Sequence, residues 1–272
     1  MSAIRHVAVN VFKESVRDKV LYSLVVFAVL LIGASYLIGQ LTAGQDVKII
    51  KDLGLASISI FGLLIAIFIG IGLVWKEVER RSIYSLLAKP LTRRDFVLGK
   101  YLGLVFTLGV NVVVMTGAFY AVLAVMAWVT PPEIRAGWPA PAADPAMLKA
   151  VLLIFIELLL VTAIALFFST FSSPFLSAVL TLGLWVIGHF NSDLRSLDST
   201  LASTLNSPMA AAAARGLYYI LPNFSAFDIK AQVVWAQPVP LSYVGLTVLY
   251  GLVYVAFVLV GAVAVFARRD FK

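Results

Sequence analysis

Cysteine is absent from the 272-residue sequence, and histidine occurs only twice, as His6 and His189. Without cysteine the chain can form neither a disulfide bond nor a thiolate metal site, and two such distant histidines do not suggest a zinc site. Charged residues make up only 13% of the chain, and the sequence offers no Ser/His/Asp set and no paired carboxylates. We therefore expect no catalytic, cofactor-binding or metal-binding residues.

A nucleotide-binding P-loop is also missing. The only Gly-Lys pair, Gly99-Lys100, is followed by Tyr101, and Arg94 stands where a P-loop has its first glycine. If the protein uses nucleotide energy, ATP must be bound by another chain. The net charge of +7, from 21 basic and 14 acidic residues, does not indicate nucleic-acid binding by itself. Basic loops on the cytoplasmic side give membrane proteins a similar balance.

Apolar residues are what the chain has in excess. They make up 61% of the sequence, and the mean hydropathy is +0.99. A soluble domain of this length has too little interior for so much apolar surface, which excludes soluble enzymes, disordered proteins and nucleic-acid-binding domains. Runs such as Ile58–Val74 are apolar on every face, whereas barrel strands alternate. The composition predicts an all-α integral membrane protein.

Six segments are long and apolar enough, or nearly so, to cross a bilayer. They lie near 21–40, 54–75, 102–128, 148–171, 174–190 and 241–267. The fifth is the shortest, and Pro174 opens it, where a missing backbone N–H is tolerated. No separate soluble domain is evident, so we expect residues 1–272 to form a single transmembrane domain.

Basic residues indicate the orientation. With the N-terminus in the cytoplasm, the segments 1–20, 76–100, 172–173 and 268–272 hold 14 of the 21 Lys and Arg residues. This positive-inside bias predicts that both termini are cytoplasmic. The segments predicted to be outside are 41–53, 129–149 and 191–240. Three tryptophans lie at or near predicted span ends, as interfacial aromatic residues do: Trp75, Trp128 and Trp185.

The outer segments differ in character. The first part of the second one, 129–147, is rich in proline and alanine and is expected to be irregular. In the extracytoplasmic loop 191–240, Ser207-Pro208 predicts the start of a short helix that runs to Arg215. Four apolar residues of the same loop are expected to fold back onto the membrane: Leu221, Phe224, Phe227 and Ile229.

Residues 4–20 predict an amphipathic helix at the inner interface. Apolar side chains recur at helical spacing from Ile4 to Val20, and charged or polar side chains such as Arg5, Lys13 and Arg17 occupy the other face. The alternative is a plain basic leader that only fixes the topology.

The cytoplasmic segment 76–95 joins the second and third spans. A partial apolar stripe follows a charged start, Pro90 ends the helix at Lys89, and Thr92 with Asp95 resembles a capping box that begins the third span. An apolar ridge on an exposed loop indicates a docking surface. The alternative is a solvated loop whose charges set the topology. The residues expected to face a docked partner are Glu77, Glu79, Arg80, Arg81, Pro90, Arg93 and Arg94.

Two further features lie within the spans. Glu157 falls among leucines and isoleucines at membrane depth, so it should face the bundle and have a partner, for which Asn111 is the candidate by depth. It either lies on a substrate or proton path or forms a structural hydrogen bond between helices. Small residues at four-residue spacing, Gly62-Ala66-Gly70 and Gly99-Gly103, allow close helix packing. They either pack within one chain or serve a dimer interface or a pore.

The cytoplasmic segment resembles the signature of ABC-2 type ABC transporter permeases. Glu79–Ser82, Leu86–Arg93 and Leu98–Lys100 are similar to that family's E-R-G-T, P-[LIV]-[ST]-R and G-K elements, although Arg81-Ser82 replaces the frequent Gly-Thr. The resemblance covers the whole chain. Leu221–Phe224 and Phe227-Asp228 are similar to the membrane subunits of Nos-type transporters within the family.

This resemblance implies an exporter built from two permease copies, a homodimer, and two cytoplasmic ABC ATPase subunits that bind the ATP. Residues 76–95 would be the coupling helix, and residues 1–20 would be the interfacial elbow helix. Spans one, two and five would line the dimer interface and the path. The location implied is the bacterial cytoplasmic (inner) membrane, with no nucleic-acid partner.

Two other classes compete with this interpretation. The first is an ion-coupled secondary transporter with Glu157 as the coupling acid, although such carriers commonly contain internal repeats, and no convincing repeat is found here. The second is an intramembrane enzyme, which the missing catalytic groups disfavour.

Overall fold

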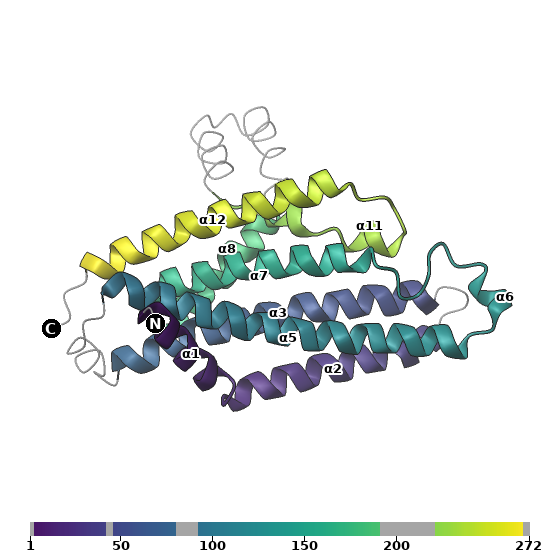
Figure 1. The fold of residues 1–272 in the computed structure, drawn as a ribbon, viewed down its shortest axis with the longest axis horizontal. Helices are drawn as coiled ribbons and strands as arrows, with labels where there is room; N and C mark the ends of the chain where they lie inside the picture. Colours follow the sequence, from purple (N-terminus) through teal and green to yellow (C-terminus); the bar gives the residue numbers. More distant parts are fainter. Residues whose placement is uncertain (1–2, 42–45, 80–91, 191–220, 269–272) are drawn as a thin grey trace, which may run out of the picture.

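The described part of the chain folds into a long bundle of helices. The computed structural model describes residues 3–41, 46–79, 92–190 and 221–268, and no strand occurs within them. Figure 1 shows the bundle along its longest axis. Its elements are α1 (Ala3–Ser15), α2 (Lys19–Gln40), α3 (Asp46–Glu79), α5 (Arg93–Val129), α6 (Pro132–Arg135), α7 (Met147–Ser169), α8 (Pro174–His189), η1 (Phe224–Phe227), α11 (Lys230–Val234) and α12 (Leu241–Arg268).

Each of the six predicted spans overlaps a helix, although α3 and α5 begin eight and nine residues earlier than predicted. Five of them, α2, α3, α5, α7 and α12, are long and apolar enough to cross a membrane. The sixth, α8, has only 16 residues and is therefore about 24 Å long, less than the apolar core of a bilayer. Its start agrees with the prediction, because the Ser173 hydroxyl caps it and Pro174 occupies its first turn.

The helix of the second predicted span, 54–75, begins earlier than predicted, because α3 begins at Asp46. Val47 and Ile50 are buried on the first turns of this helix, and Lys51 is buried as well. The Lys51 ammonium donates a hydrogen bond to the carbonyl oxygen of Pro141 across 2.8 Å. A charged residue can thus lie inside the bundle because a backbone acceptor replaces its water.

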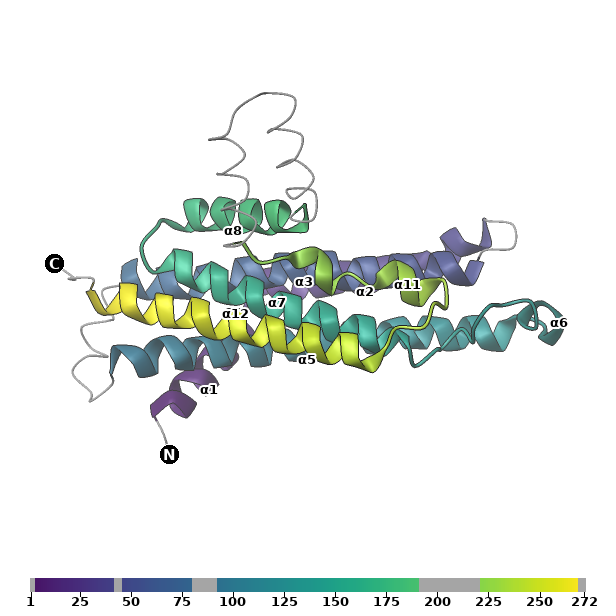
Figure 2. The same ribbon diagram turned by 90° about the horizontal axis from the view of Figure 1, so that it is seen from above.

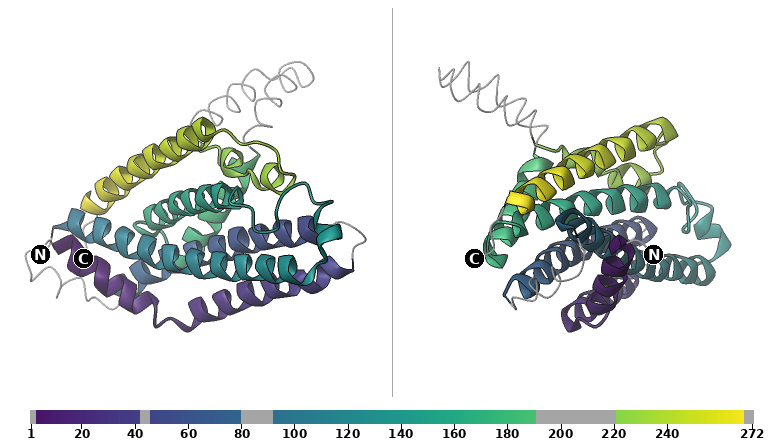
Figure 3. Two further views of the ribbon diagram at one scale, coloured as in Figure 1. Left: turned by 45° about the vertical axis from the view of Figure 1, so that its right-hand side comes forward. Right: turned by 60° about the vertical axis from the view of Figure 1, so that its left-hand side comes forward.

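The helix α7 lies at the centre of the bundle. It contacts α3, α5, α8 and α12, and every residue from Leu153 to Leu166 except Phe155 is buried. Figure 2 shows α8 on one side of α7 and α1 on the opposite side of the bundle, against α5. Figure 3 shows α12 crossing the bundle at an angle to α7. The helix α7 is thus apolar on nearly all faces because other helices, and not water, surround most of it.

The small-residue stripe of α3 packs against α7 within the chain. A Cβ on Gly62 would meet the side chain of Leu158, and one on Gly70 would lie 3.0 Å from the Cβ of Ala165. Because glycine has no side chain, α3 can approach α7 closely at both positions. Of the two readings of this stripe, packing within one chain is therefore confirmed.

Residues 221–239, which we call the return segment, run back along the bundle. Phe224 and Phe227 are fully buried and Ile229 is 3% exposed, as predicted for residues that fold back. The segment starts beside Gly188 at the end of α8, where Phe224 packs, and it ends where Lys149 donates to the Val239 carbonyl oxygen at the start of α7. The predicted helix near 208–215 lies outside the described residues.

The segment after α5 is mostly irregular, as its proline content predicts. Between Val129 and Met147 it contains only the four-residue helix α6 and turns. Two contacts hold it against the helices: the Lys51 bond to Pro141, and a bond from the Tyr120 hydroxyl to the Asp144 carbonyl oxygen across 3.0 Å. Backbone acceptors in the loop are thus satisfied by side chains of the bundle.

Candidate functional site

One end of the bundle borders the predicted ATPase-coupling segment, 76–95. Figure 1 shows the end of α3, the start of α5, α1 and the last turns of α12 near this end. Glu77 and Glu79 belong to the last turn of α3, and Arg93 is the first residue of α5, so the segment between them leaves and re-enters the bundle at one end. The predicted coupling residues outside the described residues are Arg80, Arg81 and Pro90.

The start of α5 has the predicted cap. The Thr92 hydroxyl oxygen accepts a hydrogen bond from the backbone N–H of Asp95 across 3.1 Å, which satisfies a donor that the helix itself leaves open. Arg94, in the same turn, is exposed. The cap fixes the direction in which α5 begins, and Arg94 is accessible in its first turn.

The helix α1 lies against the first half of α5 at two glycines. A Cβ on Gly99 would stand 2.7 Å from the Cβ of Val7, and one on Gly103 would stand 2.7 Å from both the Cβ of Val11 and the carbonyl oxygen of Ala8. The two backbones are therefore in close contact, and packing within one chain is confirmed for this glycine pair too. The residues of α1 that point to solvent or lipid include Arg5, Asn10, Lys13 and Glu14.

Glu157 is buried at the middle of α7, with 3% of its surface exposed. Its Oε1 accepts a hydrogen bond from the indole N–H of Trp185 across 2.7 Å, and it lies 3.6 Å from Nε2 of His189. Both partners come from α8. The expectation that Glu157 faces the bundle and has a partner is confirmed, and the contact joins two helices.

The prediction that Asn111 is the hydrogen-bond partner of Glu157 is wrong. Its amide donates to the carbonyl oxygen of Thr107 in its own helix across 2.7 Å. The helices α5 and α7 run in opposite directions, and Gly109 already faces the ring of Phe155. Two residues farther along α5, Asn111 therefore lies toward the start of α7, away from Glu157.

The neighbours of Glu157 form an aromatic and charged cluster. The ring of His189 lies 4.3 Å from that of Trp185 and stacks on Phe224 with an angle of 11° between the ring planes. An ion pair between Asp228 and Lys230, at 3.4 Å, lies near enough to act electrostatically on both Glu157 and His189. We use the name α7–α8 polar cluster for these residues: Glu157, Trp185, His189, Phe224, Asp228 and Lys230.

Trp185 and His189 were not identified as site residues from the sequence, which predicted only that Trp185 lies near the end of a span. One signal was available, because residues four apart lie on the same face of a helix and can act together. The backbone carbonyl of Trp185 lies 3.1 Å from Nδ1 of His189 and can only accept, so that contact places a proton on Nδ1. Chemically, the Trp185 N–H donates to the Glu157 carboxylate, and this bond ties α8 to α7.

Comparison with known protein families places the chain in a transporter family. Residues 6–271 match the family described as ABC-2 family transporter protein. No match to a curated protein was found. The matched stretch contains every helix from α2 to α12, the bundle end beside the coupling segment and the α7–α8 polar cluster. The chain therefore belongs to the ABC-2 transporter family and is a multi-pass membrane component of a transporter.

Proposed function

We propose that the chain is the permease subunit of an ABC exporter, which couples ATP hydrolysis by a separate ATPase to movement of a substrate across the membrane. Family membership over residues 6–271 is the observation that carries this proposal. The absence of a P-loop from the sequence assigns ATP binding to the partner. The likeness to Nos-type subunits stays a prediction, and the substrate is left open.

The ATPase docks on the end of the bundle where α3 ends and α5 begins. In our proposal Glu77, Glu79 and Arg93, with the adjoining residues of segment 76–95, form the contact surface. Two long helices start or finish there, and α7, the core of the bundle, contacts both. A displacement of segment 76–95 by the ATPase would therefore be transmitted to α7, at the centre of the bundle, through the helices α3 and α5.

This end of the bundle faces the cytoplasm of a bacterial cell, and the membrane is the cytoplasmic (inner) one. The basic residues support this orientation, since 14 of the 21 lie in segments that it places inside. Both termini are then cytoplasmic, and α1 is the interfacial elbow helix. The apolar helix α8 is the sixth membrane segment, although it is too short to cross the core unaided.

A second copy of the chain completes the transporter as a homodimer. Large apolar side chains are exposed along α2, among them Phe27 and Leu30, and along α8, among them Phe175 and Leu182. Such surfaces suit lipid or a second copy, and the resemblance to ABC-2 permeases, which implies that spans one, two and five line the dimer interface, supports a partner permease here. The exposed faces of α2 and α8 are therefore the proposed dimer-facing surfaces.

The ion-coupled alternative rested on Glu157, and membership of an ABC transporter family does not favour it. Glu157 instead accepts a hydrogen bond from Trp185 of α8, and His189 of the same helix lies 3.6 Å away. We therefore propose a structural role for the α7–α8 polar cluster in positioning α8.

Purification of the tagged protein from its native membranes tests the proposal. We expect an ATPase subunit with a P-loop to co-purify, identified by mass spectrometry of its peptides. The double variant Arg80→Glu, Arg93→Glu should lose most of the ATPase, because it reverses two charges on the proposed contact. The matched control is Arg135→Glu in α6, an exposed arginine at the opposite end of the bundle. Equal ATPase recovery from the double variant and the control would refute the docking surface, and recovery of no ATPase from any form would refute the exporter.

A further inference from the structure

A pocket of about 550 Å³ lies between the start of α5 and the last turns of α12. Arg94 and Leu98 line it on α5, and six residues between Ala256 and Ala267 line it on α12. Three of those six are alanines, whose short side chains leave room between the two helices. Val260 in this lining is 69% exposed. The pocket therefore opens toward the medium around the bundle, which for a helix that crosses a membrane is lipid.

The pocket extends along α12 over the depth of one leaflet. From residue 256 to residue 267 a helix rises by about 16 Å, at about 1.5 Å per residue. The apolar core of a bilayer is about 30 Å thick, so one leaflet contributes about 15 Å. The rings of Phe96 and Phe266 stack with 5.6 Å between their centroids and hold the two helices together near Arg94. The pocket thus has the length and the apolar lining of a site for an acyl chain.

Arg94 is the charged residue in this lining, and it lies at one end of the pocket. Its side chain is exposed, and within the described part of the chain its guanidinium has no ion pair. Arg93 begins α5 and Arg268 ends α12, so the sequence adds two cations to the same helix ends. The acidic residue of this turn, Asp95, does not belong to the lining. This end of the pocket therefore suits an anion, and a guanidinium is well shaped to bind a phosphate.

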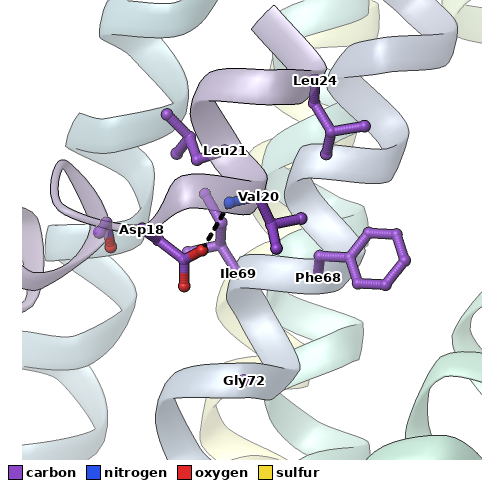
Figure 4. A pocket seen from close by; sticks show the side chains of 8 residues that line it. Asp18, Val20, Leu21, Leu24, Phe68, Ile69 and Gly72 are labelled. Atoms are coloured by element: carbon purple, nitrogen blue, oxygen red, sulfur yellow. Dashed lines mark hydrogen bonds between the residues drawn. The ribbon is translucent and has the colours of Figure 1, made fainter.

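A second apolar pocket of the bundle differs in its charge. Figure 4 shows it between α2 and α3, with Leu21 and Leu24 of α2 on one side and Phe68 of α3 on the other. Its volume is about 380 Å³, and its lining includes the carboxylate of Asp18. An anionic head would be repelled by this like charge. Of these two pockets, the one beside Arg94 is therefore the site for an anionic lipid.

We propose that the pocket between α5 and α12 binds one anionic phospholipid from the surrounding leaflet. One acyl chain lies along α12 between Ala256 and Ala267, and the phosphate faces the guanidinium of Arg94. The proposal goes beyond the coupling to an ATPase and does not depend on it, because it assigns Arg94 to a lipid and leaves Arg93 to the ATPase surface.

Native mass spectrometry of the full chain without an ATPase tests this site. The protein is purified with equal amounts of phosphatidylglycerol, phosphatidylethanolamine and phosphatidylcholine that share the same acyl chains, and the retained lipids are identified. We expect one phosphatidylglycerol molecule to be retained in preference to the two zwitterionic lipids. Equal retention of the three lipids would overturn the proposal, as would a preference for either zwitterionic lipid.

Substitutions of Arg94 test the charge. In Arg94→Gln the preference for phosphatidylglycerol over phosphatidylcholine should fall about fivefold, as expected when one basic residue at an anionic membrane surface is lost. Arg94→Lys should keep most of the preference, because the positive charge remains. The matched control is Arg5→Gln, which removes an exposed arginine of α1 near the same end of the bundle and should keep the preference. An equal fall in Arg94→Gln and Arg5→Gln would show that only the net charge matters and would overturn the site.

Filling the pocket tests where the acyl chain lies. Ala264→Phe places a ring in the pocket between α5 and α12 and should remove the retained phosphatidylglycerol. Gly72→Phe, the matched control, fills the pocket between α2 and α3, where a Cβ meets nothing within 4 Å, and should leave phosphatidylglycerol in place. If Ala264→Phe fails to fold, Arg94→Gln still decides the question, since Arg94 is exposed. Dissociation of a dimer by Ala264→Phe with unchanged lipid retention would assign the pocket to a second copy and would overturn the proposal.

Discussion

The indole N–H of Trp185 donates to the buried carboxylate of Glu157 across 2.7 Å, and this bond links two helices that are neighbours in sequence. The contact lies at the middle of α7 and near the end of α8. Because both groups are polar and largely removed from water, each needs the other. Four predictions follow from this contact and from the close contacts described with it.

Glu157→Leu should destabilise the protein, and Glu157→Gln should not do so to a comparable extent. Leucine leaves the Trp185 N–H without its acceptor, at a cost of about 1–3 kcal/mol, whereas the glutamine side-chain oxygen can still accept. Thermal unfolding in detergent measures the difference. Glu133→Gln, an exposed change in α6, serves as the control. Equal melting temperatures for the Leu and Gln variants would contradict the assigned role, and loss of transport in a stable Glu157→Gln protein would restore a functional one.

Trp185→Phe should lower the free energy of unfolding by about 1–2 kcal/mol, because an aromatic ring remains but the indole N–H donor is lost. Trp128→Phe is the matched control, since Trp128 is 85% exposed at the end of α5. In a background that already carries Glu157→Leu, Trp185→Phe should cost less, which a double-mutant cycle detects. Additive effects of the two substitutions would show that the residues are not coupled.

Gly103→Ala should separate α1 from α5. The new methyl group would stand 2.7 Å from the Ala8 carbonyl oxygen, so a backbone has to move, at a cost of about 1–3 kcal/mol. Gly117→Ala in the same helix meets nothing within 4 Å and should be neutral or slightly stabilising, because alanine favours helix more than glycine. The unfolding temperatures of the two alanine variants give the comparison, and a loss at Gly117 equal to that at Gly103 would disprove the close contact.

Lys51→Met should loosen the segment between α5 and α7. Methionine keeps the apolar stem but cannot donate to the Pro141 carbonyl oxygen. We expect trypsin to cleave after Arg135, in the exposed helix α6, several times faster than in the unmodified protein. Lys48→Met is the control, because Lys48 lies over the Trp235 ring and not against this segment. Unchanged cleavage at Arg135 in Lys51→Met would show that the bond does not hold the loop.

The helices could be predicted from the sequence because each has its own local signal. Apolar runs of membrane length predicted α2, α7 and α12 close to their observed bounds. The start of α5 was predicted from Thr92 and Asp95, whose hydrogen bond joins residues only three positions apart. The start of α3 could not be found in this way. Its first turn contains charged residues, and Lys51 is buried only because Pro141, ninety residues away, supplies an acceptor.

The partner of Glu157 could not be found from depth alone. Counting residues along the spans assumes that each helix crosses the full bilayer, and this assumption paired Glu157 with Asn111. The helix α8 has only 16 residues, so its far end lies level with the middle of α7, and Trp185 reaches Glu157 instead of the interface. The length of α8, which brings Trp185 level with Glu157, therefore determines the partner of Glu157, and the polarity of the residues alone does not.

Beyond the end of α8, the irregular backbone of the return segment lies against the core. Two tyrosine hydroxyl groups of α12 form hydrogen bonds with this backbone. The N–H of Asn223 donates to the Tyr250 oxygen across 2.7 Å, and the Tyr243 hydroxyl donates to the Ala226 carbonyl across 2.8 Å. Hydrocarbon offers no substitute for either bond. A conformational change that separated α12 from the return segment would leave these two peptide groups without hydrogen-bond partners in an apolar environment. We therefore expect α12 and the return segment to move together as one rigid unit.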